Sequence, residues 1–124
     1  MLISIEKIKE DILAQNEIVV LDVRDRSLFL KFGNAGGSNY PISEVKKGLL
    51  DPTKDFAGYK GKIIFICSGN GINSMRTAEA YRVFNRLGLR NLYRLNTSLF
   101  KWVEKYSKMD RIPDYLPAIK AKNG

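Results

Sequence analysis

The 124-residue chain contains no histidine and a single cysteine, Cys67. Without histidine, Ser-His-Asp triads, Cys-His dyads and nearly all zinc chemistry are excluded. One cysteine excludes a disulfide within the chain and any cysteine-rich metal site. We therefore expect neither a metal centre nor a cofactor. An enzyme with this composition has to rely on Cys, Lys, Arg, Asp, Glu, Tyr, Ser and backbone amide groups.

The chain also lacks long apolar runs. No segment approaches the roughly 20 apolar residues that a membrane-spanning helix needs. Residues 1–12 carry charges every few positions, unlike a signal peptide. We therefore expect a cytoplasmic protein with no membrane association. The length and the hydrophobic content of 44% predict one domain, residues 1–109, followed by a tail at residues 110–124 that contains two prolines.

Acidic residues are fewer than basic ones, which gives a formal net charge of +8. A basic protein favours anionic partners, such as small oxyanions, nucleic acids or acidic protein surfaces. The lysines and arginines are spread along the chain, and no aromatic-basic RNA-binding pattern is present. The charge is therefore typical of a solvated basic surface that can favour a small anionic partner, and nucleic-acid binding is not expected.

Helix and strand patterns alternate along the chain. Helical patterns occupy residues 4–16, 26–32, 43–48, 75–87 and 98–106. Strand patterns occupy residues 18–23, 40–42, 62–67 and 91–95. Residues 33–39 and 51–61 are rich in glycine and polar residues and predict loops. Such alternation predicts a parallel sheet that is covered by helices on both faces.

The single cysteine ends the most apolar run of the chain, residues 62–67, which predicts the central strand. Ligands of parallel sheets bind outside the carboxyl ends of the strands, which is where Cys67 is expected. An inert structural cysteine usually lies inside an apolar run, whereas this one lies at its end. The position of Cys67 therefore favours a chemical role.

The residues after Cys67 predict an anion-binding loop. Small residues at Ser68, Gly69 and Gly71 allow backbone amides to turn inward, and the helix that starts near Met75 directs its positive end toward the same place. Such a concavity binds an oxyanion and also stabilises a thiolate. Arg76 adds a positive charge with a forked donor. In a chain without histidine, this arrangement is the route by which Cys67 becomes a nucleophile.

Several motifs occur in a characteristic order: Val20-Leu21-Asp22-Val23-Arg24, the glycine-rich segment from Phe32 to Pro41, Ile64-Phe65-Ile66-Cys67, Arg76-Thr77, residues 91–95 and Trp102. Their order and spacing, over about residues 3–106, resemble the rhodanese family of single-domain sulfurtransferases. The resemblance implies a three-layer α/β/α fold with a mostly parallel central sheet of about five strands.

The resemblance also implies a reaction. Cys67 would take a sulfane sulfur from a donor such as thiosulfate, form a persulfide, and pass the sulfur to a thiophilic acceptor. Asp22 would orient an active-loop arginine, and Arg24 would lie nearby as support. The implied substrate-binding residues are Ser68, Gly69, Asn70, Gly71, Ile72, Asn73, Ser74, Met75, Arg76 and Thr77. With no second cysteine to resolve the persulfide, the acceptor has to be an external thiol or another protein.

Three features depart from the family pattern. Asn34 stands where the family usually has histidine, Thr97-Ser98 replaces a Gly-Gly pair, and the eight residues between Cys67 and Arg76 exceed the usual loop length. A longer loop can turn some amides away from the sulfur, so its catalytic competence stays open. A non-catalytic binding or redox-sensing module and a Cys-dependent phosphatase are therefore the alternative functions. A dinucleotide site is disfavoured, because Asn73 stands where its motif needs glycine.

Overall fold

The computed structural model describes residues 1–32, 37–67 and 74–106. Within these residues, five strands form one parallel sheet in the order β1-β5-β4-β2-β3. The strands are β1 (Leu2–Ile3), β2 (Ile18–Asp22), β3 (Ser38–Asn39), β4 (Lys62–Ile66) and β5 (Leu92–Leu95). The most apolar strand, β4, therefore takes the central position that the sequence predicts.

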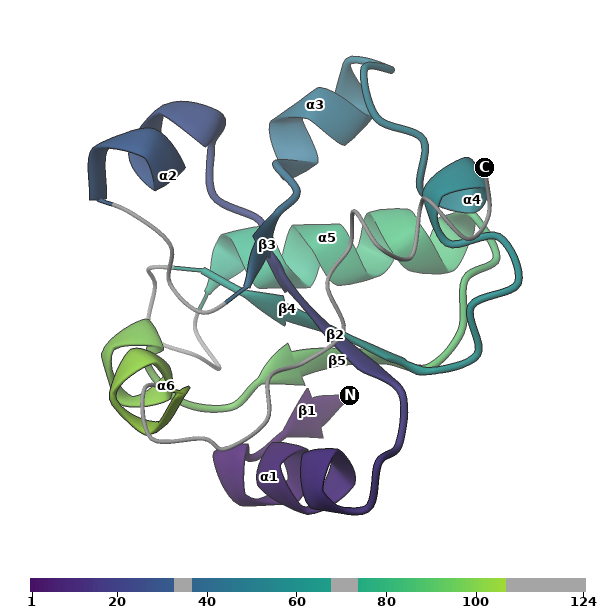
Figure 1. The fold of residues 1–124 in the computed structure, drawn as a ribbon. Helices are drawn as coiled ribbons and strands as arrows, with labels where there is room; N and C mark the ends of the chain where they lie inside the picture. The colour runs from purple at the N-terminus through teal and green to yellow at the C-terminus, as the bar shows by residue number, and fades with distance from the viewer. Residues whose placement is uncertain (33–36, 68–73, 107–124) are drawn as a thin grey trace.

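Helices cover both faces of this sheet. They are α1 (Ile5–Leu13), α2 (Arg26–Phe32), α3 (Ile42–Lys46), α4 (Pro52–Asp55), α5 (Met75–Arg86) and α6 (Leu99–Tyr106). Figure 1 shows α1 and α6 on one side of the sheet and α3, α4 and α5 on the other. This arrangement confirms the predicted three-layer α/β/α fold. None of the helices in the described part of the chain is long and apolar enough to cross a membrane.

The two central strands are apolar on both faces because both faces are covered by helices. All five residues of β2 are buried, and Val19 and Leu21 lie opposite Ile63 and Phe65 of β4 in the parallel register. Alternate residues of each strand contribute to two different apolar clusters. The sheet therefore separates two half-cores.

The half-core under α3 and α5 is rich in aromatic residues. Phe65 of β4 and Phe84 of α5 meet edge to face, with ring centroids 4.8 Å apart. Tyr40 and Phe56 pack against the same Phe84 ring. The other half-core contains aliphatic residues of α1 and the fully buried Trp102 of α6. Helix α5, which leads away from the predicted active loop, is thus anchored at Phe84.

Three short elements differ from the predictions. The edge strand lies at residues 38–39 instead of 40–42, and the buried Tyr40 only extends it through one hydrogen bond, from its N–H to the Asp22 carbonyl. Helix α4 interrupts the loop predicted at residues 51–61, because Asp51 caps it and Pro52 suits its first position. Strand β1 is a two-residue element paired with β5, too short to give a pattern.

The boundaries of α5 agree with the sequence. Ser74 caps its N-terminus by accepting a hydrogen bond from the Thr77 N–H at 3.3 Å. Gly88 follows its C-terminus with a φ of +87°, a conformation that glycine adopts without strain. Ser43, the first residue of the helical pattern expected at residues 43–48, lies inside α3, and Pro41 precedes that helix. Ser43 is therefore available for a contact elsewhere.

Candidate functional site

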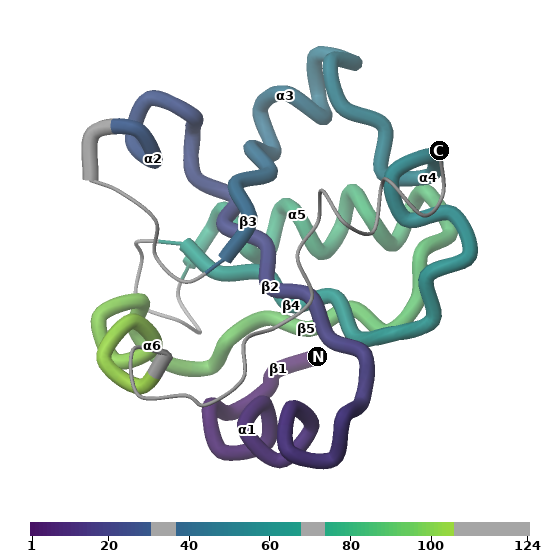
Figure 2. The backbone as a smooth tube through the Cα atoms, viewed as in Figure 1, coloured from purple at the N-terminus to yellow at the C-terminus, as the bar shows by residue number. Residues whose placement is uncertain are grey.

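Cys67 directly follows β4 at the carboxyl edge of the sheet, where the sequence predicts it. Figure 2 shows that α2, the start of α5 and α6 all lie at this edge. The side chain of Cys67 is only 7% exposed and belongs to the apolar cluster that includes Ile42 and Phe65. The sulfur therefore lies in a mostly apolar environment at the edge where parallel sheets bind ligands.

A buried ion pair lies beside this cysteine. Asp22 ends β2, lies opposite Ile66 in the register, and is fully buried. Its carboxylate accepts two hydrogen bonds of 3.0 Å from Arg24 Nε and one of 2.6 Å from Arg24 Nη2. It also accepts the backbone N–H of Arg24 at 3.1 Å. Charge-assisted hydrogen bonds of this forked kind fix both position and orientation, so Arg24 is held rigidly.

The electrostatics connect Arg24 to the cysteine. Hydrogen bonds from Arg24 to Asp22 raise the pKa of Arg24, burial opposes this rise, and the negative charges of Asp22 and of the Cys67 thiolate add to it. Arg24 therefore keeps its positive charge although it is only 4% exposed. The guanidinium is therefore a permanent cation that interacts electrostatically with Cys67.

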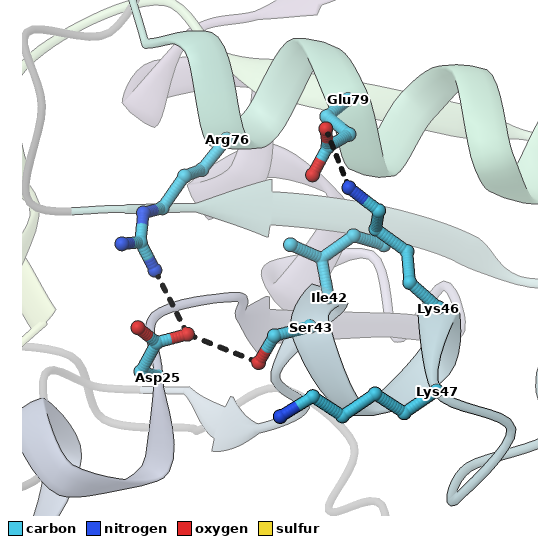
Figure 3. A pocket seen from close by; sticks show the side chains of 7 residues that line it. All are labelled: Asp25, Ile42, Ser43, Lys46, Lys47, Arg76 and Glu79. Carbon is cyan, nitrogen blue, oxygen red and sulfur yellow. Dashed lines mark hydrogen bonds and ion pairs between the residues drawn. The ribbon is translucent and has the colours of Figure 1, made fainter.

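The partner of Asp22 differs from the prediction. Asp22 was expected to orient the active-loop arginine, but it binds Arg24, and Arg76 binds Asp25 instead, with Nη1 3.1 Å from Oδ1. Asp25 lies between β2 and α2, and its carboxylate and the Arg76 guanidinium are both about two-fifths exposed. Ser43 also donates its hydroxyl to Asp25 at 3.0 Å, as Figure 3 shows. Arg76 therefore lies at the rim of the site, and Arg24 lies inside it.

The first turn of α5 is fixed to the sheet by a residue that the sequence did not identify as part of the site. Arg94 lies on β5 opposite Phe65 and reaches across to α5. Its Nε donates to Thr77 Oγ1 at 3.1 Å, and its Nη2 donates to the Ser74 carbonyl at 3.0 Å. Thr77 Oγ1 in turn donates to the same carbonyl. The sequence feature that could have identified Arg94 is its position as a charged residue within a predicted strand.

The structure describes four residues of the predicted substrate-binding segment. Ser74 and Thr77 are buried, Arg76 is at the rim, and Met75 is 84% exposed and so does not line the buried site. The other predicted binding residues, 68–73, lie outside the described residues, as do Asn34 and the tail at 110–124. Within the described ranges, no group of three or more Cys, Asp or Glu side chains is placed to hold a metal ion.

The sequence matches no family model and no curated protein, but solved structures share its fold. A rhodanese-related protein from Thermoplasma volcanium is 26% identical, with a TM-score of 0.55, and the match covers 84% of this chain and 91% of that one. A human single-domain sulfurtransferase is 21% identical, with a TM-score of 0.61 and coverages of 84% and 96%. A protein from Rhodopseudomonas palustris described as a possible tyrosine phosphatase is 17% identical, with a TM-score of 0.62 and coverages of 84% and 80%. Each match covers most of the chain and therefore concerns the fold as a whole.

Proposed function

The chain is a rhodanese-like domain, and on that basis we propose that it is a sulfurtransferase that carries a sulfane sulfur on Cys67. The position of Cys67 supports this proposal most strongly. The sulfur ends the central strand of the fold, next to a buried guanidinium that Asp22 holds in place. A sulfurtransferase with the same fold is known among the similar structures.

The first half-reaction loads the cysteine. The Cys67 thiolate attacks the outer sulfur of thiosulfate, the sulfur–sulfur bond of the donor breaks, and sulfite leaves with the electron pair. Cys67 is left as a persulfide anion. Arg24 is a fixed cation near this negative charge, and a fixed cation stabilises the anion before and after the transfer.

The donor's oxyanion needs a second set of contacts. We assign these to the amides of residues 68–73 and to Arg76, whose guanidinium is two-fifths exposed and uses Nη1 for Asp25. Its other N–H groups can therefore donate hydrogen bonds to an oxygen of thiosulfate. Ser74 and Thr77 act indirectly, because they shape the helix end that carries Arg76.

The second half-reaction unloads the cysteine onto an external acceptor, because the chain has no other thiol. An acceptor thiolate attacks the outer sulfur of the persulfide, and the Cys67 thiolate leaves. A non-catalytic module is the main alternative, favoured by the 7% exposure of Cys67.

A phosphatase is a second alternative, suggested by the description of the Rhodopseudomonas palustris protein. Such an enzyme needs a protonated acid for the leaving alkoxide. Among the described residues, Asp25 is the carboxyl group that contacts Arg76, and hydrogen bonds from Arg76 and Ser43 lower its pKa. Asp25 is therefore ionised at neutral pH and is a poor general acid, which favours sulfur transfer.

A steady-state assay compares these functions. We expect the protein to form thiocyanate from thiosulfate and cyanide, and Cys67→Ser to form none. Hydrolysis of p-nitrophenyl phosphate, measured in parallel, should stay at the level of the Cys67→Ser protein. Cys67-dependent phosphate release without thiocyanate would support the phosphatase, and the absence of both activities would support the binding module.

A further inference from the structure

A pocket of about 450 Å³ opens between α3 and α5. This volume lies in the range of small-molecule sites, which is about 300–1,000 Å³. Ile42, Ser43 and Lys46 line it from α3, together with Lys47, which follows the end of that helix. Arg76 and Glu79 line it from α5, and Asp25 completes it. Figure 3 shows the Ile42 side chain lying among these polar groups, so the pocket combines an apolar patch with a charged rim.

The rim of the pocket carries both signs of charge. Arg76 pairs with Asp25 at 3.1 Å, and Lys46 pairs with Glu79 at 3.3 Å. The ammonium group of Lys47 has no ion-pair or hydrogen-bond partner among the described residues, although its charge helps to lower the pKa of Asp25. Three cations and two carboxylates therefore face one cavity.

Both carboxylates keep one oxygen available. Asp25 uses Oδ1 for Arg76 and for Ser43, and Glu79 uses Oε2 for Lys46. Within the described residues, Asp25 Oδ2 and Glu79 Oε1 have no side-chain partner. A ligand that carries only negative charge is repelled by these carboxylates, and a ligand that carries only positive charge is repelled by the lysines. A ligand that carries a carboxylate and an ammonium group is complementary to both.

The pocket shares one lining residue with the apolar cluster that contains the cysteine. Ile42, which lines it, belongs to the same apolar cluster as Cys67. Arg76, on its rim, lies in the first turn of the helix that follows the segment after Cys67. The pocket therefore lies on the α5 side of the sheet at its carboxyl edge, the same edge at which Cys67 follows β4.

We infer, on the basis of the function proposed above, that this pocket binds the sulfur acceptor, and that the acceptor is an amino-acid-like thiol with a carboxylate and an ammonium group. Thiosulfate is a dianion and has no group for Asp25 and Glu79, so the pocket suits the second substrate better than the donor. The carboxylate of the acceptor binds Lys47 and Arg76, and its ammonium group binds Glu79 and Asp25.

The transfer at this site is balanced without a further reactant. The acceptor thiol loses its proton to solvent, and its thiolate attacks the outer sulfur of the Cys67 persulfide. The bond between the two sulfurs of the persulfide breaks, and its electron pair returns to Cys67 as a thiolate. The acceptor leaves with the additional sulfur as its own persulfide.

Four small thiols that carry a carboxylate, an ammonium group, both or neither separate the contribution of each charged group to acceptor binding. The Cys67 persulfide is first prepared with thiosulfate and freed of excess donor, and loss of the sulfur is then followed by intact mass. The acceptors are L-cysteine, cysteamine, 3-mercaptopropionate and 2-mercaptoethanol. Their rates are normalised to rates with a small-molecule persulfide, which removes differences in intrinsic reactivity. We expect saturation at the lowest concentration for L-cysteine and a kcat/KM about tenfold above that of 2-mercaptoethanol, because two exposed ion pairs are gained.

Two variants test the residues. Lys47→Gln should raise KM about two- to fivefold for L-cysteine and 3-mercaptopropionate, the effect of one exposed ion pair, but not for cysteamine. Glu79→Gln should raise KM for L-cysteine and cysteamine but not for 3-mercaptopropionate. Lys9→Gln removes one positive charge from α1, which lies on the opposite face of the sheet, and should leave the KM values of all these acceptors unchanged. Limiting rates should stay constant, because these side chains do not touch the reacting sulfur.

Equilibrium binding of S-methyl-L-cysteine, which has no thiol, tests the pocket without a persulfide. We expect binding that Lys47→Gln and Glu79→Gln both weaken. Equal KM values for the four thiols, or variants that behave like Lys9→Gln, would overturn the inference while leaving the persulfide chemistry intact. Failure of thiosulfate to load Cys67 would overturn the proposed function instead, and the binding measurement would still decide whether the pocket selects a zwitterion.

Discussion

Asp22 and Arg24 place two full charges inside the protein, next to its only cysteine. Removing charges from water is costly, and the cost is offset only where the geometry is good and the polar atoms are satisfied. Four hydrogen bonds from Arg24 to the Asp22 carboxylate meet this condition. The pair therefore has a structural role as well as a position beside the sulfur.

Replacing Arg24 tests how much the fold depends on this pair. We expect Arg24→Gln to lower the free energy of unfolding by about 3–5 kcal/mol, because Asp22 would remain buried without its counter-charge. Urea denaturation measures the change. Arg26→Gln is the matched control, since Arg26 is half-exposed in its 2.9 Å pair with Glu44 and should cost less than about 1 kcal/mol. Similar losses in both variants would contradict a special role for the buried pair.

The residue types at this site could be predicted from the sequence, but their pairing could not. Asp22 and Arg24 end an apolar strand, and this pattern indicates polar groups at the sheet edge. The resemblance implied the active-loop arginine as the partner of Asp22 and gave Arg24 only a supporting place nearby, whereas Asp22 binds Arg24. Arg24 lies only two residues after Asp22 and pairs with it at the end of the strand. Arg76 pairs instead with Asp25, which lies outside the sheet.

At the scale of elements, the contact between β5 and α5 positions the site. Arg94 joins the strand next to β4 to the first turn of α5 through two hydrogen bonds. That turn closes the segment that begins after Cys67. Its position relative to the sulfur therefore depends on a side chain from another element.

Arg94→Gln tests this attachment. We expect sulfur loading of Cys67 by thiosulfate to slow about tenfold, because hydrogen bonds to a charged donor are worth about 1.5–3 kcal/mol each and the first turn of α5 would loosen. The rate of mass gain after addition of thiosulfate measures this. Arg90→Gln, an exposed arginine before the same strand, is the control. An unchanged loading rate in Arg94→Gln would show that the first turn holds its position without Arg94.

A second contact attaches α1 to the start of β4. Asp11 is buried, and it accepts hydrogen bonds from Lys62 and Asn16. Burial alone would raise the pKa of Asp11, but these hydrogen bonds and the positive charges of Lys62 and Lys7 lower it below the usual 3.8. A carboxyl group whose pKa falls on folding stabilises the protein above its unfolded pKa and loses this effect as the pH drops through its folded pKa.

Stability measured against pH therefore distinguishes the wild type from Asp11→Asn. We expect the wild type to be more stable at neutral pH and the difference to shrink as the pH falls below about 3.8. Urea denaturation at several pH values gives both curves. A difference that stays constant across this range would contradict the contribution of the ionised Asp11.

Elements with a long periodic pattern could be predicted, and short ones could not. Strands β2 and β4 and helix α5 have clear apolar patterns, and the structure has them within about two residues of the prediction. The two-residue β3 depends on pairing with β2, and the four-residue α4 depends on the Asp51 cap. Tertiary contacts and capping, which leave little periodic signal, determine such elements.

At the scale of the whole molecule, one sheet places the candidate site, and the chain as a whole carries a net charge of +8. A field of this sign attracts small anions and is screened by salt. The overall charge therefore affects how fast an anionic donor reaches Cys67, and not how the chain folds.

The salt dependence of loading tests this effect. We expect the second-order rate constant for sulfur transfer from thiosulfate to fall several-fold from low to high NaCl concentration. Alkylation of Cys67 by iodoacetamide, an uncharged reagent, is the control and should change much less. Equal salt dependence of the two reactions would indicate that salt acts on the cysteine itself and not on the approach of the anion.

Intact mass spectrometry after treatment with thiosulfate and removal of small molecules tests the central claim most directly. We predict that the wild-type protein gains the mass of one sulfur atom and loses it when an acceptor thiol is added, while Cys67→Ser gains nothing. A wild-type protein that takes up no sulfur from thiosulfate or from other sulfane donors would contradict sulfur transfer and leave a rhodanese-like fold with an inert cysteine.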